Sequence, residues 1–367
     1  MRTTTLLSTI TLIPSLVTAE LFQDVTRSRF EALMQENNLL LTAFTSRTLD
    51  SLEPFHDTFT KAAANVSTPL VTIDCDKEIE LCKEQDINAY PTIRLMAKND
   101  GQEVDVTRYR GRRTKNAIRS FATKHELPVL IHIQPHDFQA LKTIDDIVVV
   151  AYLKPDQEEL LQTFRDVAES HNQKFVFGYV TDAAIADAEA VTVPSIVCYK
   201  NLDGDNKSLS GHFSEADVES FLIAASTYAV KEFRERDMED FMLPNKLTTY
   251  IFTASEDDAI AVRHELTPLA TKYDKFVTFA ITDTHEYAAM AQNFGVNMDL
   301  ALPALVVHAP VNDNIFSYQQ GKRMVADVVE AMLTTILHGK ATSGQVFGGE
   351  APDMEEDIGS STIHSEL

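Results

Sequence analysis

Apolar and polar positions follow the same order three times along this chain. Each copy opens with a short run of apolar residues, typical of a buried strand, over residues 39–44, 147–153 and 247–252. Apolar residues then recur every three or four positions, which predicts a helix with one buried face. A second β-branched run ends on an acidic residue, which is Asp74, Asp182 or Asp283. Each copy therefore begins as strand, helix and strand.

A lone proline marks the second half of each copy. A further helix leads to this proline, which opens an apolar strand, and another strand and a last helix follow. The prolines are Pro91, Pro194 and Pro303. They lie about one hundred residues apart, which is the size of a small globular domain.

The order of elements predicts a mixed sheet in each copy, with a parallel segment beside an antiparallel hairpin and helices on both faces. This arrangement resembles the thioredoxin fold. The predicted fold class is therefore α/β, with three tandem thioredoxin-like domains. We expect these domains over residues 20–126, 127–230 and 231–338.

The two ends of the chain carry expected address signals. Residues 1–19 have the pattern of a secretory signal peptide, and no later segment approaches the roughly 20 apolar residues of a membrane span, so we expect no membrane insertion. Residues 339–367 predict an acidic, flexible tail. Its last residues resemble a lumenal retention signal with Ser365 in place of Asp. They are His364, Ser365, Glu366 and Leu367. We therefore expect the protein to be located in the lumen of the endoplasmic reticulum. Glycosylation sequons at Asn65 and Asn206 agree with this location.

The balance of charges excludes some partners. With 55 acidic and 32 basic residues the net charge is −23, which opposes binding to nucleic acid. A basic cluster at residues 108–115 is either a solvated hairpin end or a docking patch for an acidic partner. No motif for a phosphate, a metal or a nucleophilic serine is present, so we expect no metal and no cofactor beyond weak calcium binding by the tail acids.

Several short motifs resemble the protein disulfide isomerase family, and its fungal members in particular. In the first copy they are 71–75, Leu81-Cys82, Tyr90-Pro91 and 109–111, and in the third they are 294–296, 302–303 and 337–340. The resemblance spans residues 20 to 345. It implies the first catalytic domain and the two following noncatalytic domains of that family, without its second catalytic domain.

The family's catalytic thiols are missing from the first copy. The resemblance implies a Trp-Cys-Gly-His-Cys segment between the first strand and its helix, and its two cysteine positions fall here on Ser46 and Leu49. No cysteine precedes Cys75, and the chain has no tryptophan. Dithiol exchange needs a thiolate at a helix N-terminus and a second thiol one turn later. We therefore expect a redox-inactive domain.

The cysteines that remain allow two interpretations. Cys75 and Cys82 form either a structural disulfide, which the resemblance also implies, or the only catalytic dithiol of the chain. Closing this loop would stabilise the fold by roughly 2 to 3 kcal/mol in the chain-entropy model. Cys198, within an apolar strand, is expected to be a buried thiol, with a regulatory or intermolecular role as the alternative.

Two peptide-binding regions are implied by the resemblance. Tyr90 and Pro91 would present an exposed backbone for strand addition, or serve only the fold. The third copy would hold the main apolar pocket for unfolded chains. Its candidate residues are Phe241, Met242, Phe279 and Phe294, although Phe279 also fits an ordinary core.

The predicted function is that of a noncatalytic chaperone or escort in the endoplasmic reticulum. Its expected partners are unfolded or partly folded polypeptides and other folding factors. One alternative is an enzyme, a protein disulfide isomerase acting through Cys75 and Cys82. Another alternative is a calcium-buffering or assembly subunit that relies on the acidic tail.

Overall fold

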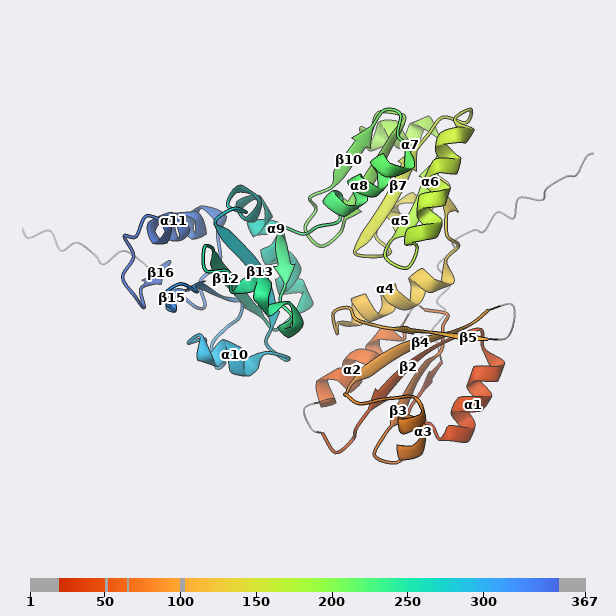
Figure 1. The fold of residues 1–367 in the computed structure, drawn as a ribbon, viewed down its shortest axis with the longest axis horizontal. Helices are drawn as coiled ribbons and strands as arrows, with labels where there is room; N and C mark the ends of the chain where they lie inside the picture. The colour runs from red at the N-terminus through yellow and green to blue at the C-terminus, as the bar shows by residue number, and fades with distance from the viewer. Residues whose placement is uncertain (1–19, 50–51, 65, 100–102, 350–367) are drawn as a thin grey trace, which may run out of the picture. The chain divides into compact units, whose positions relative to one another are not determined.

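The computed structural model describes residues 20–349, apart from 50–51, 65 and 100–102 (Figure 1). The chain divides into two compact units, Met1–Thr227 and Tyr228–Leu367. The first unit holds two sheets and the second unit holds one, and each sheet mixes parallel and antiparallel pairs between helices. The prediction of three thioredoxin-like domains is confirmed. In the described part of the chain, no helix combines the length and the apolar character needed to cross a membrane.

The first domain has a five-stranded sheet in the order β1-β3-β2-β4-β5. Its strands are β1 (Leu21–Phe22), β2 (Leu39–Thr45), β3 (Leu70–Asp74), β4 (Thr92–Lys98) and β5 (Val104–Arg108). Its helices are α1 (Arg27–Glu36), α2 (Glu53–Ala62), α3 (Ile79–Glu84) and α4 (Lys115–Glu126). Apolar residues of α2 and α4 pack on one face of the sheet, and those of α1 and α3 pack on the other. Burial on both faces explains the continuous apolar run of β2.

The second domain repeats this plan with the strand order β10-β9-β7-β8-β6. Its strands are β6 (Ile131–His132), β7 (Ile147–Tyr152), β8 (Val176–Val180), β9 (Ser195–Lys200) and β10 (Lys207–Ser210). Its helices are α5 (Phe138–Lys142), α6 (Glu158–His171), α7 (Ala183–Ala188) and α8 (Glu215–Ala225). Cys198 is fully buried in β9, as predicted, and this burial raises the pKa of its thiol to about 11.

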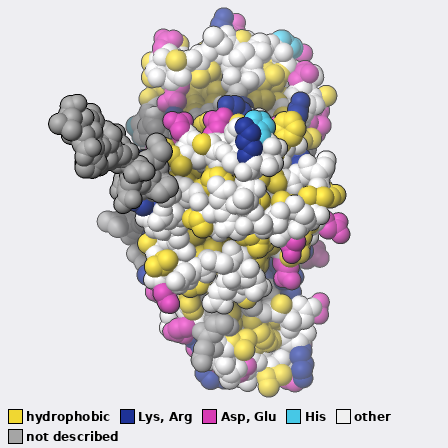
Figure 2. All heavy atoms as spheres, turned by 90° about the vertical axis from the view of Figure 1, so that its left-hand side faces the viewer, with side chains coloured by type: hydrophobic (Ala, Val, Ile, Leu, Met, Phe, Trp, Pro, Cys, Tyr) yellow, Lys and Arg dark blue, Asp and Glu magenta, His cyan; other side chains and the backbone are white. Residues whose placement is uncertain are grey.

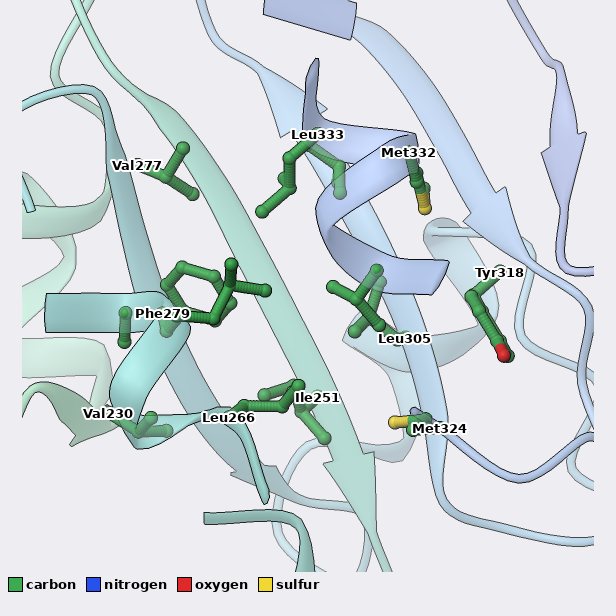
Figure 3. Packing of buried hydrophobic residues seen from close by; sticks show 14 of the residues in the cluster. Val230, Ile251, Leu266, Val277, Phe279, Leu305, Tyr318, Met324, Met332 and Leu333 are labelled. Atoms are coloured by element: carbon green, nitrogen blue, oxygen red, sulfur yellow. The ribbon is translucent and has the colours of Figure 1, made fainter. Parts of the chain in front are cut away.

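The third domain has a six-stranded sheet in the order β11-β13-β12-β14-β15-β16. Its strands are β11 (Val230–Glu232), β12 (Leu247–Thr253), β13 (Val277–Asp283), β14 (Ala304–Ala309), β15 (Asn314–Tyr318) and β16 (Val346–Phe347). Its helices are the 3₁₀ helix η2 (Glu235–Phe241), then α9 (Glu256–Lys272), α10 (Ala288–Asn293) and α11 (Ala326–Leu337). Figure 3 shows Phe279, Leu266 and Leu333 among the buried apolar residues that form the core of this domain.

Strand β16 corrects the sequence-based expectation for the end of the chain. Residues 339–367 were expected to form a flexible tail, yet Val346 and Phe347 pair with Ser317 and Tyr318 of β15. The backbone amide of Gln319 also donates to the carbonyl oxygen of Phe347 at 2.6 Å. The expectation is wrong for these residues. A two-residue strand between glycines gives no periodic signal in the sequence.

The three prolines occupy equivalent places, immediately before β4, β9 and β14. The peptide bonds Tyr90-Pro91, Val193-Pro194 and Leu302-Pro303 are all cis. The thioredoxin resemblance implies a cis bond at these positions, and the structure agrees with it.

Candidate functional sites

The loop after β2 occupies the place of the expected dithiol, and an acidic side chain fixes it. The buried hydroxyl of Ser46 donates to Oδ2 of Asp76 at 2.8 Å, and the backbone amide of Thr48 donates to the same oxygen at 3.0 Å. These two hydrogen bonds lower the pKa of Asp76, because they stabilise its ionised form. Ser46 is therefore a hydrogen-bond donor to a carboxylate whose lowered pKa makes it a weak base for activating the hydroxyl.

The loop also differs from a redox site in its position relative to the helix. Helix α2 begins at Glu53, so Ser46 and Leu49 both lie before its first turn. The field of a helix terminus acts within that first turn, where it lowers the pKa of a thiol. Leu49 is exposed, and its carbonyl oxygen accepts a hydrogen bond from the amide of Leu52 at 2.9 Å. Neither the side chains nor the geometry of this loop favour a thiolate.

His56 lies in α2, close to the same loop. Its ring is buried beside Phe55, and neither ring nitrogen has a hydrogen-bond partner among the described residues. Burial lowers its pKa, and the positive charge of Arg47 lowers it further. Arg47 itself is held by Asp24 through two contacts of 3.1 and 3.0 Å. His56 is therefore a neutral, buried ring at neutral pH.

We expect His56 to make the stability of the first domain depend on pH. In the unfolded chain a histidine takes up a proton near pH 6.5, whereas the folded pKa of His56 is lower. The free energy of unfolding should therefore be highest above about pH 6.5 and decrease as the pH falls toward the pKa of His56 in the folded chain. Thermal melting between pH 7.5 and 5 should show this decline in the parent chain and a smaller decline in His56→Phe. Replacing the exposed His212 with Phe is the control, and an identical slope in all three proteins would contradict this prediction.

The cysteine pair of the first domain is bonded in the structure. Cys75 follows β3, Cys82 lies in α3, and the two sulfur atoms form a disulfide. Both residues are buried, with Phe44, Ile73 and Met96 in the same core cluster. An attacking thiolate has no direct access to this bond.

The proposed docking edge at Tyr90 and Pro91 is only partly open. Tyr90 is exposed, whereas Pro91, immediately before β4, is buried. The hydroxyl of Thr92 donates to the carbonyl oxygen of Ala89 at 2.7 Å, which holds the turn before the strand. Peptide binding here stays a prediction.

The aromatic residues predicted to line a pocket in the third domain are largely buried. Phe241 and Phe279 are each only 1% exposed. Phe241 packs against Phe233 with ring centroids 5.3 Å apart, and Phe279 lies in the main core (Figure 3). The prediction that these two residues line an exposed pocket is therefore wrong, because core packing covers both of them.

The other two predicted pocket residues lie nearer the surface. Phe294 is half-buried, with its ring centroid 4.9 Å from that of Tyr250. Met242 is exposed, and its sulfur lies 4.0 Å from the hydroxyl oxygen of Tyr250. Burial raises the pKa of Tyr250 to about 12, so this hydroxyl stays protonated. Contact of Phe294 and Met242 with a peptide stays a prediction.

The third domain presents an apolar groove that the sequence did not indicate. Phe276, Val311 and Leu337 line it and are 57%, 73% and 38% exposed. The groove encloses about 200 Å³, and its other lining residues are Pro244, Asn245, Lys246, Leu247, Ala309 and Pro310. Figure 2 shows how patches of hydrophobic side chains interrupt the polar surface of the chain. Four separate segments build the groove, so no local sequence pattern could reveal it.

The expected modification and address signals are mostly outside the described residues. This applies to the signal peptide at 1–19, to Asn65 and to the four residues His364, Ser365, Glu366 and Leu367. Asn206 is described and exposed, and its Oδ1 accepts a hydrogen bond from the amide of Lys200 at 2.8 Å. Among the described residues, no group of three or more metal-ligating side chains comes together.

The sheets, the helices on both faces and the cis proline before the fourth strand of each domain define a protein of thioredoxin-like domains. Two families match the chain: Thioredoxin over residues 22–124 and Thioredoxin-like domain over residues 153–325. Matches to both families agree with the fold described above.

More particularly, the chain is similar in sequence to fungal protein disulfide-isomerases. It is 29% identical to a protein disulfide-isomerase of Aspergillus niger over 314 residues, which cover 85% of this chain and 60% of that protein. It is 28% identical to a protein disulfide-isomerase of Aspergillus oryzae over 330 residues, which cover 88% of this chain and 63% of that protein. The chain thus spans less than two thirds of the length of these curated relatives. A crystal structure of human ERp44 aligns with a TM-score of 0.41 and 13% identity over 91% of this chain and 95% of that one.

Proposed function

We propose that this chain is a noncatalytic folding factor of the endoplasmic reticulum lumen that binds partly folded polypeptides. The proposal rests on the loop after β2, where the hydroxyl of Ser46 donates a hydrogen bond to Asp76. It also rests on the sequence, in which no cysteine precedes Cys75. A folding factor without an accessible dithiol acts by holding its substrate. Similarity to protein disulfide-isomerases supports a role in folding.

The groove of the third domain is the surface best suited to such binding. Phe276, Val311 and Leu337 expose apolar area from three separate segments, and a contiguous apolar patch on a soluble protein is typical of an interaction site. A volume near 200 Å³ accommodates one or two apolar side chains rather than a whole folded partner. A groove of this size would select short apolar segments, which are exposed in a partly folded chain and buried once it has folded.

We expect the double variant Phe276→Ser/Val311→Ser to suppress aggregation several-fold less than the parent chain. Light scattering of thermally unfolding citrate synthase measures this, because that assay needs no thiol chemistry. The matched control is Ile223→Ser in α8, which removes a side chain that is 74% exposed outside the groove. If the parent chain itself does not slow aggregation, the chaperone function is wrong. If the double variant equals the control, only the assignment to the groove is wrong.

A second candidate is a thiol-disulfide oxidoreductase that works through Cys75 and Cys82, because these residues form a disulfide. Reduction of insulin separates the two functions. We expect the parent chain to give the same background rate as Cys75→Ser/Cys82→Ser. A rate well above that of the double variant would favour the enzyme.

The third possibility, calcium buffering by the acidic tail, requires a different experiment. Calorimetric titration with calcium compares the full chain with a chain truncated after Gly349, a position that preserves β16. We expect weak binding that is lost with the tail. Equal binding by both chains would place any calcium site elsewhere.

A further inference from the structure

Strand β5 is an edge of the first sheet with backbone groups available for pairing. It is last in the order β1-β3-β2-β4-β5 and pairs with β4 alone. The amide of Tyr109 donates to the carbonyl of Ile93, and the amide of Asn99 donates to the carbonyl of Glu103. In an antiparallel pair, residues that are hydrogen-bonded to the partner strand alternate with residues that are not. Residues 103, 105, 107 and 109 therefore face β4, and the amides and carbonyls of 104, 106 and 108 point away from the sheet.

The same three positions also present their side chains to solvent. Val104 and Val106 are 38% and 49% exposed, and Arg108 is exposed as well. Natural edge strands are usually protected by a central charge, a proline or a bulge. Strand β5 has no proline and no bulge, and its one charge before Arg108 is the exposed Asp105. Its β-branched residues Val104, Val106 and Thr107 favour strand pairing.

Positive charge gathers where β5 ends. Arg108, Arg110 and Lys115 are exposed there, on a chain whose net charge is −23. Arg112 differs from them, because its guanidinium contacts both carboxylate oxygens of Asp146 at 2.8 Å. A partner that follows the strand therefore meets Val104 and Val106 with their outward backbone groups first and a cationic end next.

We propose that the β5 edge accepts an extended peptide by strand addition, with an acidic stretch of the peptide beside Arg108, Arg110 and Lys115. Main-chain hydrogen bonds to residues 104, 106 and 108 provide affinity, and alternate side chains of the peptide cover Val104 and Val106. The cations select acidic partners and accelerate the encounter at low salt. This site lies in the first domain and is independent of the groove proposed for folding substrates.

Fluorescence anisotropy with the full chain tests the charge requirement. The probe is a labelled peptide with three alternating Thr-Val pairs next to four glutamates, and its counterpart has four lysines instead. We expect the acidic peptide to bind at 50 mM salt at least tenfold more tightly than the basic peptide. The acidic peptide should bind more weakly at 200 mM salt than at 50 mM salt.

The variant Arg108→Glu/Arg110→Glu should weaken binding of the acidic peptide at least tenfold. The matched control Lys154→Glu/Lys174→Glu changes the net charge equally at exposed positions of the second domain and should change binding less than twofold. Equal loss in both variants, or no binding by the parent chain, would overturn the proposal.

The backbone requirement has its own test. Val106→Pro removes an amide that points to solvent, so we expect it to weaken peptide binding at least tenfold, whereas Val106→Thr keeps the amide and stays within twofold. Should Val106→Pro fail to fold, hydrogen exchange on the parent chain decides the matter: saturating acidic peptide should slow exchange over residues 103–109. Unchanged exchange contradicts strand addition. Sedimentation that shows a dimer in the parent chain, lost in Val106→Pro and kept in Val106→Thr, would instead assign the edge to a second copy of this chain.

Discussion

Replacing Phe279 with Ala is expected to lower the free energy of unfolding of the third domain by about 3 to 5 kcal/mol. Phe279 is only 1% exposed in β13 and packs in a cluster with Ile251, Leu266 and Leu305 (Figure 3). Removing its ring deletes apolar contacts and leaves a cavity that rigid neighbouring strands fill only in part. Native-state hydrogen exchange of third-domain peptides measures the loss.

Phe276 provides the matched control for this substitution. It lies three residues earlier on the same segment and is 57% exposed, so Phe276→Ala should change the stability by no more than about 0.5 kcal/mol. The two substitutions distinguish a core residue from a residue of the binding surface. Phe276, and not Phe279, should contact the aggregating protein in the aggregation assay. A similar destabilisation by both substitutions would show that Phe276 is not a free surface residue.

The second large effect is expected for Cys75→Ala/Cys82→Ala, which should destabilise the first domain by about 2.5 kcal/mol. The disulfide closes a loop between residues separated by seven positions, and opening it restores conformational freedom to the unfolded chain. Hydrogen exchange of first-domain peptides measures the loss of stability. Cys198→Ala is the control, because its effect should stay within the second domain. A first domain equally stable without the bond would show that packing alone holds α3 against β3.

The sequence was sufficient to predict the architecture, because local patterns determine it. Apolar runs such as 247–252 and the acidic residue after each second strand recur in each copy, and the three sheets follow from them. The disulfide between Cys75 and Cys82, which the family resemblance implied, is also present. Such features depend on neighbours a few residues away.

The binding surfaces could not be predicted in the same way. Every residue of β13 before Asp283 is buried, so alternation along this strand does not say which aromatic residue faces solvent. Phe276, Val311 and Leu337 come together only when β13, β14 and α11 have packed. The contact between Ser46 and Asp76 joins positions 30 residues apart, which no motif of the first strand could show.

Strand β16 has a consequence for how this protein is made. Its two residues come after α11, yet they complete the sheet beside β15. During translation the outer edge of β15 therefore stays unpaired until residues beyond Phe347 have left the ribosome, although α11, the last described helix, has by then emerged. A nascent chain that stalls just before this point would offer an unpaired strand to its neighbours on the polysome, which is a known route to misassembly.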